Sequence, residues 1–363
     1  MITRKLCFFC AAFILLAGAA AHAQKKKKNE EPITQTLPEL KDPPAAITAE
    51  TGRLVFRVTP LSAKGLLSAQ VREALKILVH DSKSASVVKL RAFVSGSGDM
   101  RRVPMIVSEV FTERKLPLPA VTTVQVGGLP LVGAQVVLES IELDNKKTVN
   151  PSGLAFFAGQ QGKDVTQSVT QLQTAVNAAG VKPASVLRVT CFLSSLDMLQ
   201  AAQTAIANAF PAAATNYVQP QRLALEPLVE CEAVGRLEKP PASAVQFLNP
   251  SGLTQNPNYT QIVLVNAPNL VFSGTQMAFR DQDNDIRLAF ERLLKQLEPL
   301  KVTYKDVFWT SLYPLTRPVA DKTGNIRFEF LDHARPPAST RLLFEGLPSL
   351  DASVAFDVIA AAN

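Results

Sequence analysis

The chain has 363 residues, of which 47% are hydrophobic and 19% charged, which is typical of globular proteins and excludes a disordered or collagen-like chain. Of the formal net charge of +7, two charges lie on Arg4 and Lys5 and four on the run from Lys25 to Lys28, which leaves +1 for the rest. A nearly neutral body lacks the basic surface of a nucleic-acid-binding protein, so we expect no nucleic-acid partner.

The N-terminal residues 1–23 predict a secretory signal peptide. Arg4 and Lys5 precede an apolar run from Leu6 to Leu16, and the small residues around His22 supply a cleavage site. The alternative is a retained membrane anchor, but the apolar run is short for a bilayer span. We therefore expect an exported protein, periplasmic or secreted, with no integral membrane segment after cleavage.

Residues 24–50 combine the lysine run with several prolines and predict a disordered linker. Residues 51–145 then predict the order strand, helix, strand, helix, strand, strand. The segments are RLVFRVTPL, LLSAQVREALKILVH, SVVKLRAFVSGSG, VPMIVSEVFTER, TTVQVGGL and AQVVLESIEL. Val71, Leu75 and Leu78 lie on one face of the first helix, as an amphipathic surface helix requires.

The same order recurs twice, in residues 146–240 and 246–363. The pentapeptide NPSGL opens both later copies, at Asn150 and at Asn249, and precedes an apolar strand each time. A helix follows each strand. Its apolar residues repeat at helical spacing, namely Val165, Val169, Leu172 and Val176 in one copy and Ile286, Phe290, Leu293 and Leu297 in the other.

The sequence thus predicts an α/β (α+β) fold of three tandem β-α-β-α-β-β modules, of which the first is the most degenerate. Each predicted sheet is apolar on both faces. Because the helices of a module cover one face, another part of the chain must cover the second. We therefore expect the three modules to pack against one another in one monomeric chain.

Cysteine and histidine give little functional signal. Cys191 and Cys231 each alternate with apolar neighbours on a strand, and we interpret them as buried unpaired residues in preference to a disulfide, which stays open. No cysteine and histidine cluster has metal-ligand spacing, and we expect neither a metal nor a cofactor.

The closing segments resemble the RidA/YjgF family of small proteins. They read LPAVTTVQVGGLP with VVLESIEL, AATNYVQPQRLALEPLVECEAVG, and PPASTRLLFEGLP with VAFDVIA. NYTQIVLVNAPNLVFSGTQ is similar to the family's opening strands. The resemblance covers the chain from Thr51 onward and implies a chorismate-mutase-like fold. Family members are homotrimers with a cleft at each subunit interface, so it also implies an intrachain pseudo-trimer.

The family's site residues have diverged here. The arginine that binds the substrate carboxylate follows Pro-Ala in the family, and Val121, Thr215 and Ser339 take its place. The family's closing-strand glutamate activates water, and the resemblance places acids there in every copy. These candidate catalytic residues are Glu139, Glu232 and Asp357. The alternative is that they are polar residues of an alternating strand.

The third copy retains the most of the family's opening. Tyr259 and the pair Ser273 and Gly274 match it, whereas the second copy has Ala158 before its glycine. Arg341 lies two residues after Ser339 and points to the same strand face, so it is a candidate replacement for the missing arginine. Tyr259, Ser273, Gly274 and Arg341 are therefore the expected ligand-binding residues. A packing role for Tyr259 and a turn role for Ser273 are the alternatives.

Two function classes stay open. The absence of the arginine favours binding of a small carboxylate or amide metabolite, or a scaffold role, over efficient catalysis. The alternative is an imine or enamine deaminase of the RidA type that uses the closing-strand acids.

Overall fold

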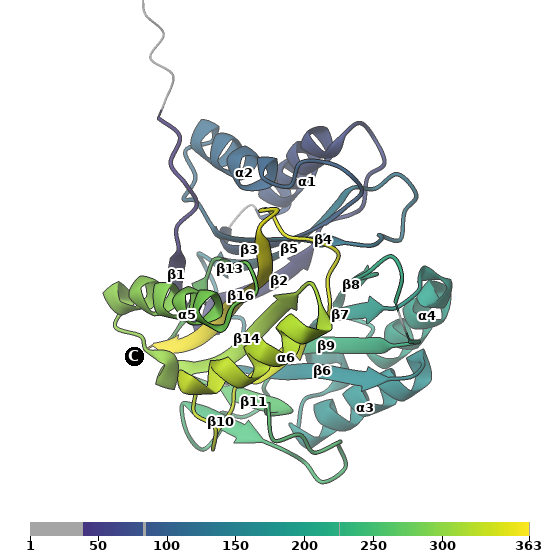
Figure 1. Ribbon diagram of the computed structural model, residues 1–363. Coiled ribbons are helices and arrows are strands. Elements are labelled where there is room, and N and C mark those ends of the chain that lie inside the picture. The colour runs from purple at the N-terminus through teal and green to yellow at the C-terminus, as the bar shows by residue number, and fades with distance from the viewer. Residues whose placement is uncertain (1–38, 83–84, 225, 363) are drawn as a thin grey trace, which may run out of the picture. The chain divides into compact units, whose positions relative to one another are not determined.

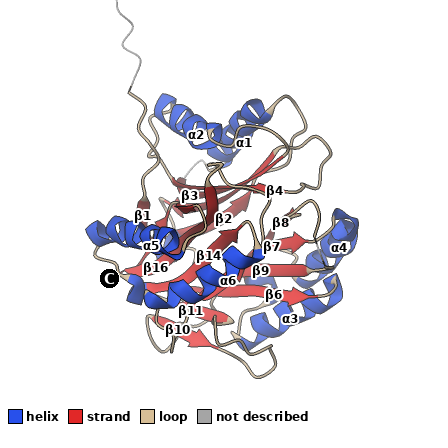
Figure 2. Cartoon of the chain, viewed as in Figure 1, coloured by secondary structure: helices blue, strands red, loops and turns tan. Residues whose placement is uncertain are grey.

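The computed structural model describes residues 39–82, 85–224 and 226–362. The described residues from Leu40 onward form one compact unit, in which three sheets lie inward and helices lie outside them (Figure 1 and Figure 2). The expected signal peptide lies outside the described residues. No helix of the described part has both the length and the hydropathy needed to cross a bilayer. No group of three or more acidic, histidine or cysteine side chains there is arranged to hold a metal ion.

The first sheet has the strand order β2-β5-β3-β4. Its elements are β2 (Leu54–Val58), α1 (Leu67–Asp81), β3 (Ala85–Ser95), α2 (Arg102–Glu113), β4 (Ala120–Val126) and β5 (Val136–Asp144). The two helices bury their apolar faces against one side of the sheet, where Leu75 and Phe111 pack on Leu90 and Leu138. This arrangement leaves the other side to contact the rest of the chain.

The second sheet has the order β10-β11-β6-β9-β7-β8. Its elements are β6 (Leu154–Gly162), α3 (Val165–Ala178), β7 (Val186–Leu193), α4 (Leu199–Ala209), β8 (Ala214–Val218), β9 (Val229–Arg236), β10 (Val245–Leu248) and β11 (Ile262–Val265). Asp164 caps α3, because its carboxylate accepts a hydrogen bond from the Gln167 amide at 2.9 Å. Gly180, at φ +68°, ends the same helix in the left-handed conformation that favours glycine.

The third sheet has the order β1-β12-β16-β14-β15, and β13 also pairs with β16. Its elements are β1 (Ala46–Glu50), β12 (Asn269–Ser273), β13 (Gln276–Phe279), α5 (Asp283–Leu297), β14 (Val307–Pro314), α6 (Arg317–Ile326), β15 (Ala338–Arg341) and β16 (Ala352–Ala362). The strands β2-β5-β3-β4, β6-β9-β7-β8 and β12-β16-β14-β15 therefore share one order and one connectivity.

Three strands, β1, β10 and β11, extend the sheet of a neighbouring segment. β1 pairs with β12 in antiparallel register from Ala46 with Ser273 to Glu50 with Asn269. β11 pairs with β6 of the second sheet rather than with β12. The expectation of a disordered linker over residues 24–50 is thus wrong for its last five residues. They gain an edge strand as a hydrogen-bonding partner that the sequence pattern does not reveal.

Apolar side chains of all three sheets meet on their inner faces. One cluster joins Phe93 of β3, Phe192 of β7 and Tyr313 of β14, with Phe344 after β15. The ring centroids of Phe93 and Phe192 are 6.0 Å apart, and those of Tyr313 and Phe344 are 5.1 Å apart. The face of each sheet that its own helices do not cover is buried in this way.

The register makes the closing-strand acids equivalent. Arg91 lies opposite Glu139 in the first sheet, and Thr190 lies opposite Glu232 in the second. Ser311 lies opposite Asp357 in the third. The resemblance had assigned the three acids to one position, and the pairing places them there.

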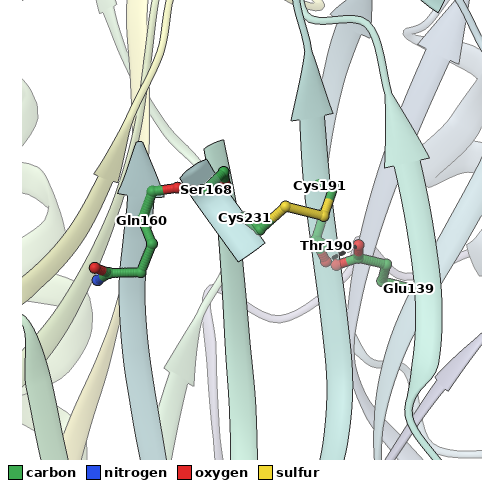
Figure 3. Close-up of a disulfide and its surroundings, with 6 residues drawn as sticks. All are labelled: Glu139, Gln160, Ser168, Thr190, Cys191 and Cys231. Atoms are coloured by element: carbon green, nitrogen blue, oxygen red, sulfur yellow. Dashed lines mark hydrogen bonds between the residues drawn. A yellow bond between two sulfur atoms is a disulfide. The ribbon is translucent and has the colours of Figure 1, made fainter. Parts of the chain in front are cut away.

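Cys191 and Cys231 form a disulfide between β7 and β9, which corrects the expectation of two unpaired cysteines (Figure 3). The two residues lie directly opposite each other in antiparallel register. Both are fully buried on the side of the sheet that α3 and α4 cover. The alternating pattern of the two strands correctly predicted that both cysteines are buried. It did not predict their pairing, because strand register across 40 residues is a tertiary property.

Candidate sites between the sheets

Glu139 and Glu232 share a buried ionic cluster between the first and second sheets. Arg91 donates from Nε and Nη2 to Glu139 at 2.8 and 2.6 Å, and from Nη2 to Glu232 at 2.5 Å. Arg188 adds a second cation, with its Nη1 3.6 Å from the Glu139 carboxylate. Thr190 donates to Glu139 at 2.6 Å, as Figure 3 shows. Two guanidinium groups thus face two carboxylates.

The charge of this cluster determines the ionisation of Glu139. Burial alone would raise the pKa of its carboxyl, but Arg91 and Arg188, with hydrogen bonds from Thr190 and Asn216, lower that pKa to about 2. Burial likewise opposes the charge of Arg91, yet the two glutamates raise its pKa well above the usual value. Both charges therefore persist at neutral pH and neutralise each other.

Asp357 has a cationic partner between the first and third sheets. Lys89 Nζ lies 3.4 Å from the Asp357 carboxylate and donates to the Ser273 carbonyl. Thr122 donates to the same carboxylate oxygen at 2.6 Å. Burial lowers the pKa of Lys89, and the nearby Asp357 carboxylate opposes this shift. A lysine of the first sheet thus lies beside the acid of the third.

Ser273 and Gly274 belong to this same interface. The Ser273 hydroxyl accepts a hydrogen bond from the Val358 amide at 2.9 Å. The Gly274 amide donates to the Ala45 carbonyl at 2.7 Å. Both residues, which the sequence analysis singled out for ligand binding, therefore make contacts within the protein.

Glu230 of β9 has a different environment from these three acids. It is only 7% exposed, and within the described residues no hydrogen bond to its carboxylate is formed. The carboxylate lies over Gly159 of β6, where any Cβ atom would overlap it. Burial, then the charge of Glu232, raises the pKa of Glu230 to about 8, and Arg341 opposes this shift. Glu230 is therefore mostly protonated at neutral pH.

Tyr259 and Arg341 of the third module lie near Glu230. Tyr259 precedes β11, and burial, followed by the charge of Glu230, raises the pKa of its hydroxyl. Arg341, at the end of β15, is exposed and donates from Nη1 to the Ala320 carbonyl of α6 at 3.0 Å. Gly324 leaves room for this guanidinium, because a Cβ there would lie 2.6 Å from Nη1.

The predicted site residues are thus divided among three interfaces. Glu139 and Glu232 meet at the first, and Asp357 meets Ser273 at the second. Tyr259 and Arg341 lie near Glu230 at the third, between the second and third sheets.

Glu230 is a candidate site residue that was not predicted from the sequence. A signal was present, because Glu230 lies two residues before Glu232 on the same strand face. Glu230 is also the acidic residue among the three equivalent positions of the three sheets. Glu230 lies opposite Phe192, whereas Val137 and Ala355 occupy the equivalent positions opposite Phe93 and Tyr313.

Two surface cavities lie apart from these acids. One, of about 450 Å³, lies between β10 and the segment 334–336, where the Arg335 guanidinium is 5.3 Å from the centre of the Phe247 ring. The other, of about 740 Å³, lies between α1 and the segment 60–64. Glu230, Tyr259 and Arg341 line neither cavity.

No family model and no curated protein matches the chain. Solved structures are similar to part of it. One is a conserved Rid-family protein from Yersinia pestis, with 15% identity, a TM-score of 0.30, and coverage of 33% of this chain and 99% of that one. A YjgF-family member from Neisseria meningitidis has 12% identity, a TM-score of 0.25, and coverage of 33% and 95%.

A third similar structure is a member of the YjgF/YER057c/UK114 family from Mycobacterium tuberculosis. It has 17% identity, a TM-score of 0.24, and coverage of 32% of this chain and 99% of that one.

Proposed function

We propose that this chain is an exported RidA-like protein of three tandem modules that form an intrachain pseudo-trimer. Its site between the second and third sheets binds a small ligand with a carboxylate or amide group. The other two interfaces act as a scaffold. The disulfide between Cys191 and Cys231 supports export, because disulfides persist in oxidising compartments.

The observation that carries this proposal is the contrast among the buried acids. Protein cations lie against the carboxylates of Glu139, Glu232 and Asp357. A ligand at those acids would have to displace an ion pair that is already desolvated, which is costly. Glu230 lacks such a partner, and an exposed arginine and a tyrosine lie near it. A tyrosine hydroxyl, a protonated carboxyl and a guanidinium are all hydrogen-bond donors to a carboxylate.

Thermal unfolding in the presence of propionate or acetamide tests the proposal. A ligand that binds only the folded state raises Tm. We expect propionate to raise the Tm of the wild type, and this rise to be lost in Arg341→Ala and reduced in Tyr259→Phe. Arg317→Ala, an exposed arginine of the same module, is the matched control and should behave as wild type. An equal rise in Arg341→Ala would place the site elsewhere.

An imine or enamine deaminase is the second candidate, and the raised pKa of Glu230 favours it. A carboxyl with a pKa near neutrality is suited to general acid catalysis. Glu230 would protonate the imine nitrogen as water adds to the imine carbon, and its carboxylate would take up the proton that the water loses, which gives a carbinolamine. Glu230 would then protonate the amine nitrogen and accept the hydroxyl proton, and the carbon–nitrogen bond would break to leave a carbonyl group and ammonia. The test is ammonia release from a 2-imino acid generated in situ by an amino acid oxidase. We expect Glu230→Gln to slow any such activity about 100-fold or more. Wild-type activity in that variant would exclude this mechanism.

A further inference from the structure

The third interface differs from the other two in its balance of charge. Between the first and second sheets, Arg91 and Arg188 face Glu139 and Glu232. Between the first and third sheets, Lys89 faces Asp357. Each of these buried interfaces therefore contains as many carboxylates as cations, as expected where charges are removed from water.

The third interface has two arginines. The Arg341 guanidinium lies over Gly324 of α6. Arg327 follows Gly324 by three residues, about one helical turn, and begins a short 3₁₀ turn (Arg327–Glu329) after α6. Arg327 is only 4% exposed, and its Nη2 donates to the carbonyl of Asn258, the residue before Tyr259. Its Nε is buried and has no hydrogen-bonding partner in the described chain. The pKa of Arg327 is lowered to about 10, first by burial and then by the charge of Arg341.

No carboxylate of the described chain forms an ion pair with either arginine. The acids that are near in sequence have other partners. Glu329 binds Arg287 at 2.7 Å, and Asp332 lies 3.9 Å from Arg335. The remaining acid near Arg341 is Glu230, whose raised pKa leaves it mostly neutral at pH 7.

We propose that Arg327 and Arg341 together form a subsite for a dianionic group, either a dicarboxylate or a phosphate ester. This inference rests on the proposed function and specifies the charge of its ligand. A monocarboxylate bound at the exposed Arg341 would leave the buried Arg327 without a counter-charge. A dianion neutralises both and can accept hydrogen bonds from both planar guanidinium groups. The unsatisfied Nε of Arg327 supplies a donor that such a ligand would use.

Titration calorimetry on the full chain, with inorganic phosphate, succinate and propionate at pH 7 and equal ionic strength, tests this inference. We expect one of the two dianions to bind at least about 10-fold more tightly than propionate, since each 1.4 kcal/mol of added interaction is tenfold. Tighter binding of phosphate would indicate a phosphate ester as the ligand, and tighter binding of succinate would indicate a dicarboxylate. Equal affinity for propionate and both dianions would overturn the inference and leave the proposed function intact. No binding of any probe would overturn both.

Variants separate the two arginines. Arg327→Gln should reduce dianion affinity at least about 10-fold and leave propionate affinity unchanged, whereas Arg341→Gln should reduce both. Arg317→Gln is the control and should change neither. If Arg327→Gln fails to fold, Gly324→Ala provides an independent test, because its Cβ would displace the Arg341 guanidinium. Dianion affinity that survives in Arg327→Gln, or in Gly324→Ala where that variant serves as the test, refutes the subsite.

Discussion

At the scale of single residues, Glu230 and Glu232 show how neighbouring acids on one strand face acquire opposite properties. Glu232 reaches Arg91 at 2.5 Å, across the boundary with the first sheet. Glu230 has no cation within ion-pair distance in the described chain and lies over Gly159. Strand alternation therefore sets the direction of both side chains, but the neighbouring sheet determines which one is neutralised.

The raised pKa of Glu230 predicts a pH-dependent gain in stability for Glu230→Gln. The folded state holds this proton more tightly than the unfolded chain, so ionisation opposes folding. The cost is absent below pH 4.5, grows as the pH rises and is complete above pH 8. We expect the free energy of unfolding of the variant to exceed that of the wild type by up to about 4 kcal/mol at pH 8 and by little at pH 4. Urea unfolding at the two pH values measures this, with the exposed Glu226→Gln as control. A pH-independent difference would contradict the assignment.

The buried cluster around Arg91 predicts a large loss of stability in Arg91→Met. The substitution leaves Glu139 and Glu232 with Arg188 as their remaining cation, and we expect a cost of roughly 3–5 kcal/mol at pH 7. The loss should shrink at pH 4, because Arg91 helps to hold the pKa of Glu139 low, and Glu139 without that ion pair protonates more readily. Urea unfolding of this variant and of the exposed Arg101→Met, which should be nearly unaffected, tests the expectation. A loss as small as that of the control would show that the cluster contributes little.

At the scale of elements, β9 determines the arrangement of the first and third interfaces. It carries Glu230 and Glu232 on its inner face and Cys231 between them on the outer face, where the disulfide joins it to β7. A slip of one residue would exchange the two faces and bury the acids under α3. The cross-link prevents this slip.

The disulfide predicts that Cys191 and Cys231 give no free thiol in the folded protein. Replacement of both by alanine removes a link across 40 residues and should lower stability by about 3–4 kcal/mol. A thiol titration of the chain that begins at Gln24, native and denatured, checks the pairing, and urea unfolding of the double variant checks its energy. Two titratable thiols in the denatured, unreduced protein would contradict the pairing.

At the scale of the whole molecule, the sheets depend on one another for their edges and their inner faces. β1 completes the third sheet and β11 extends the second, while Phe93, Phe192 and Tyr313 meet between the sheets. A segment cut at a module boundary would thus lose a strand, a covered face or both. It would expose a large apolar patch.

Light scattering tests the expected assembly. The chain from Gln24 should have the mass of one copy, because its inner sheet faces are already covered within the chain. A stable species of three times that mass would contradict an intrachain pseudo-trimer. The excised residues 51–145 should be insoluble or self-associate, and a soluble folded monomer of that segment would contradict the dependence on neighbouring sheets.

Much of the secondary structure was determined by the sequence alone, because it follows from local periodicity. The apolar spacing of Val71, Leu75 and Leu78 predicts α1, and Gly180 marks the end of α3. The recurrence of one element order in residues 51–145, 146–240 and 246–363 predicts the shared strand order of the three sheets. These features depend on residues that are close together along the chain.

The partners of the buried charges were decided by the tertiary structure alone. Lys89 lies 268 positions before Asp357, and Glu230 lies 111 positions before Arg341, so no local pattern predicts that the members of either pair lie near each other. The disulfide likewise depends on the register of β9 against β7, and the placement of β1 and β11 depends on which sheet edge lies near them. The ionisation of an acid follows from its burial and from the charges that tertiary packing places beside it. For that reason the sequence identified the strands that bear the acids. Only the packing of the sheets distinguishes Glu230, which lacks an ion-pair partner in the described chain, from Glu139, Glu232 and Asp357, which have one.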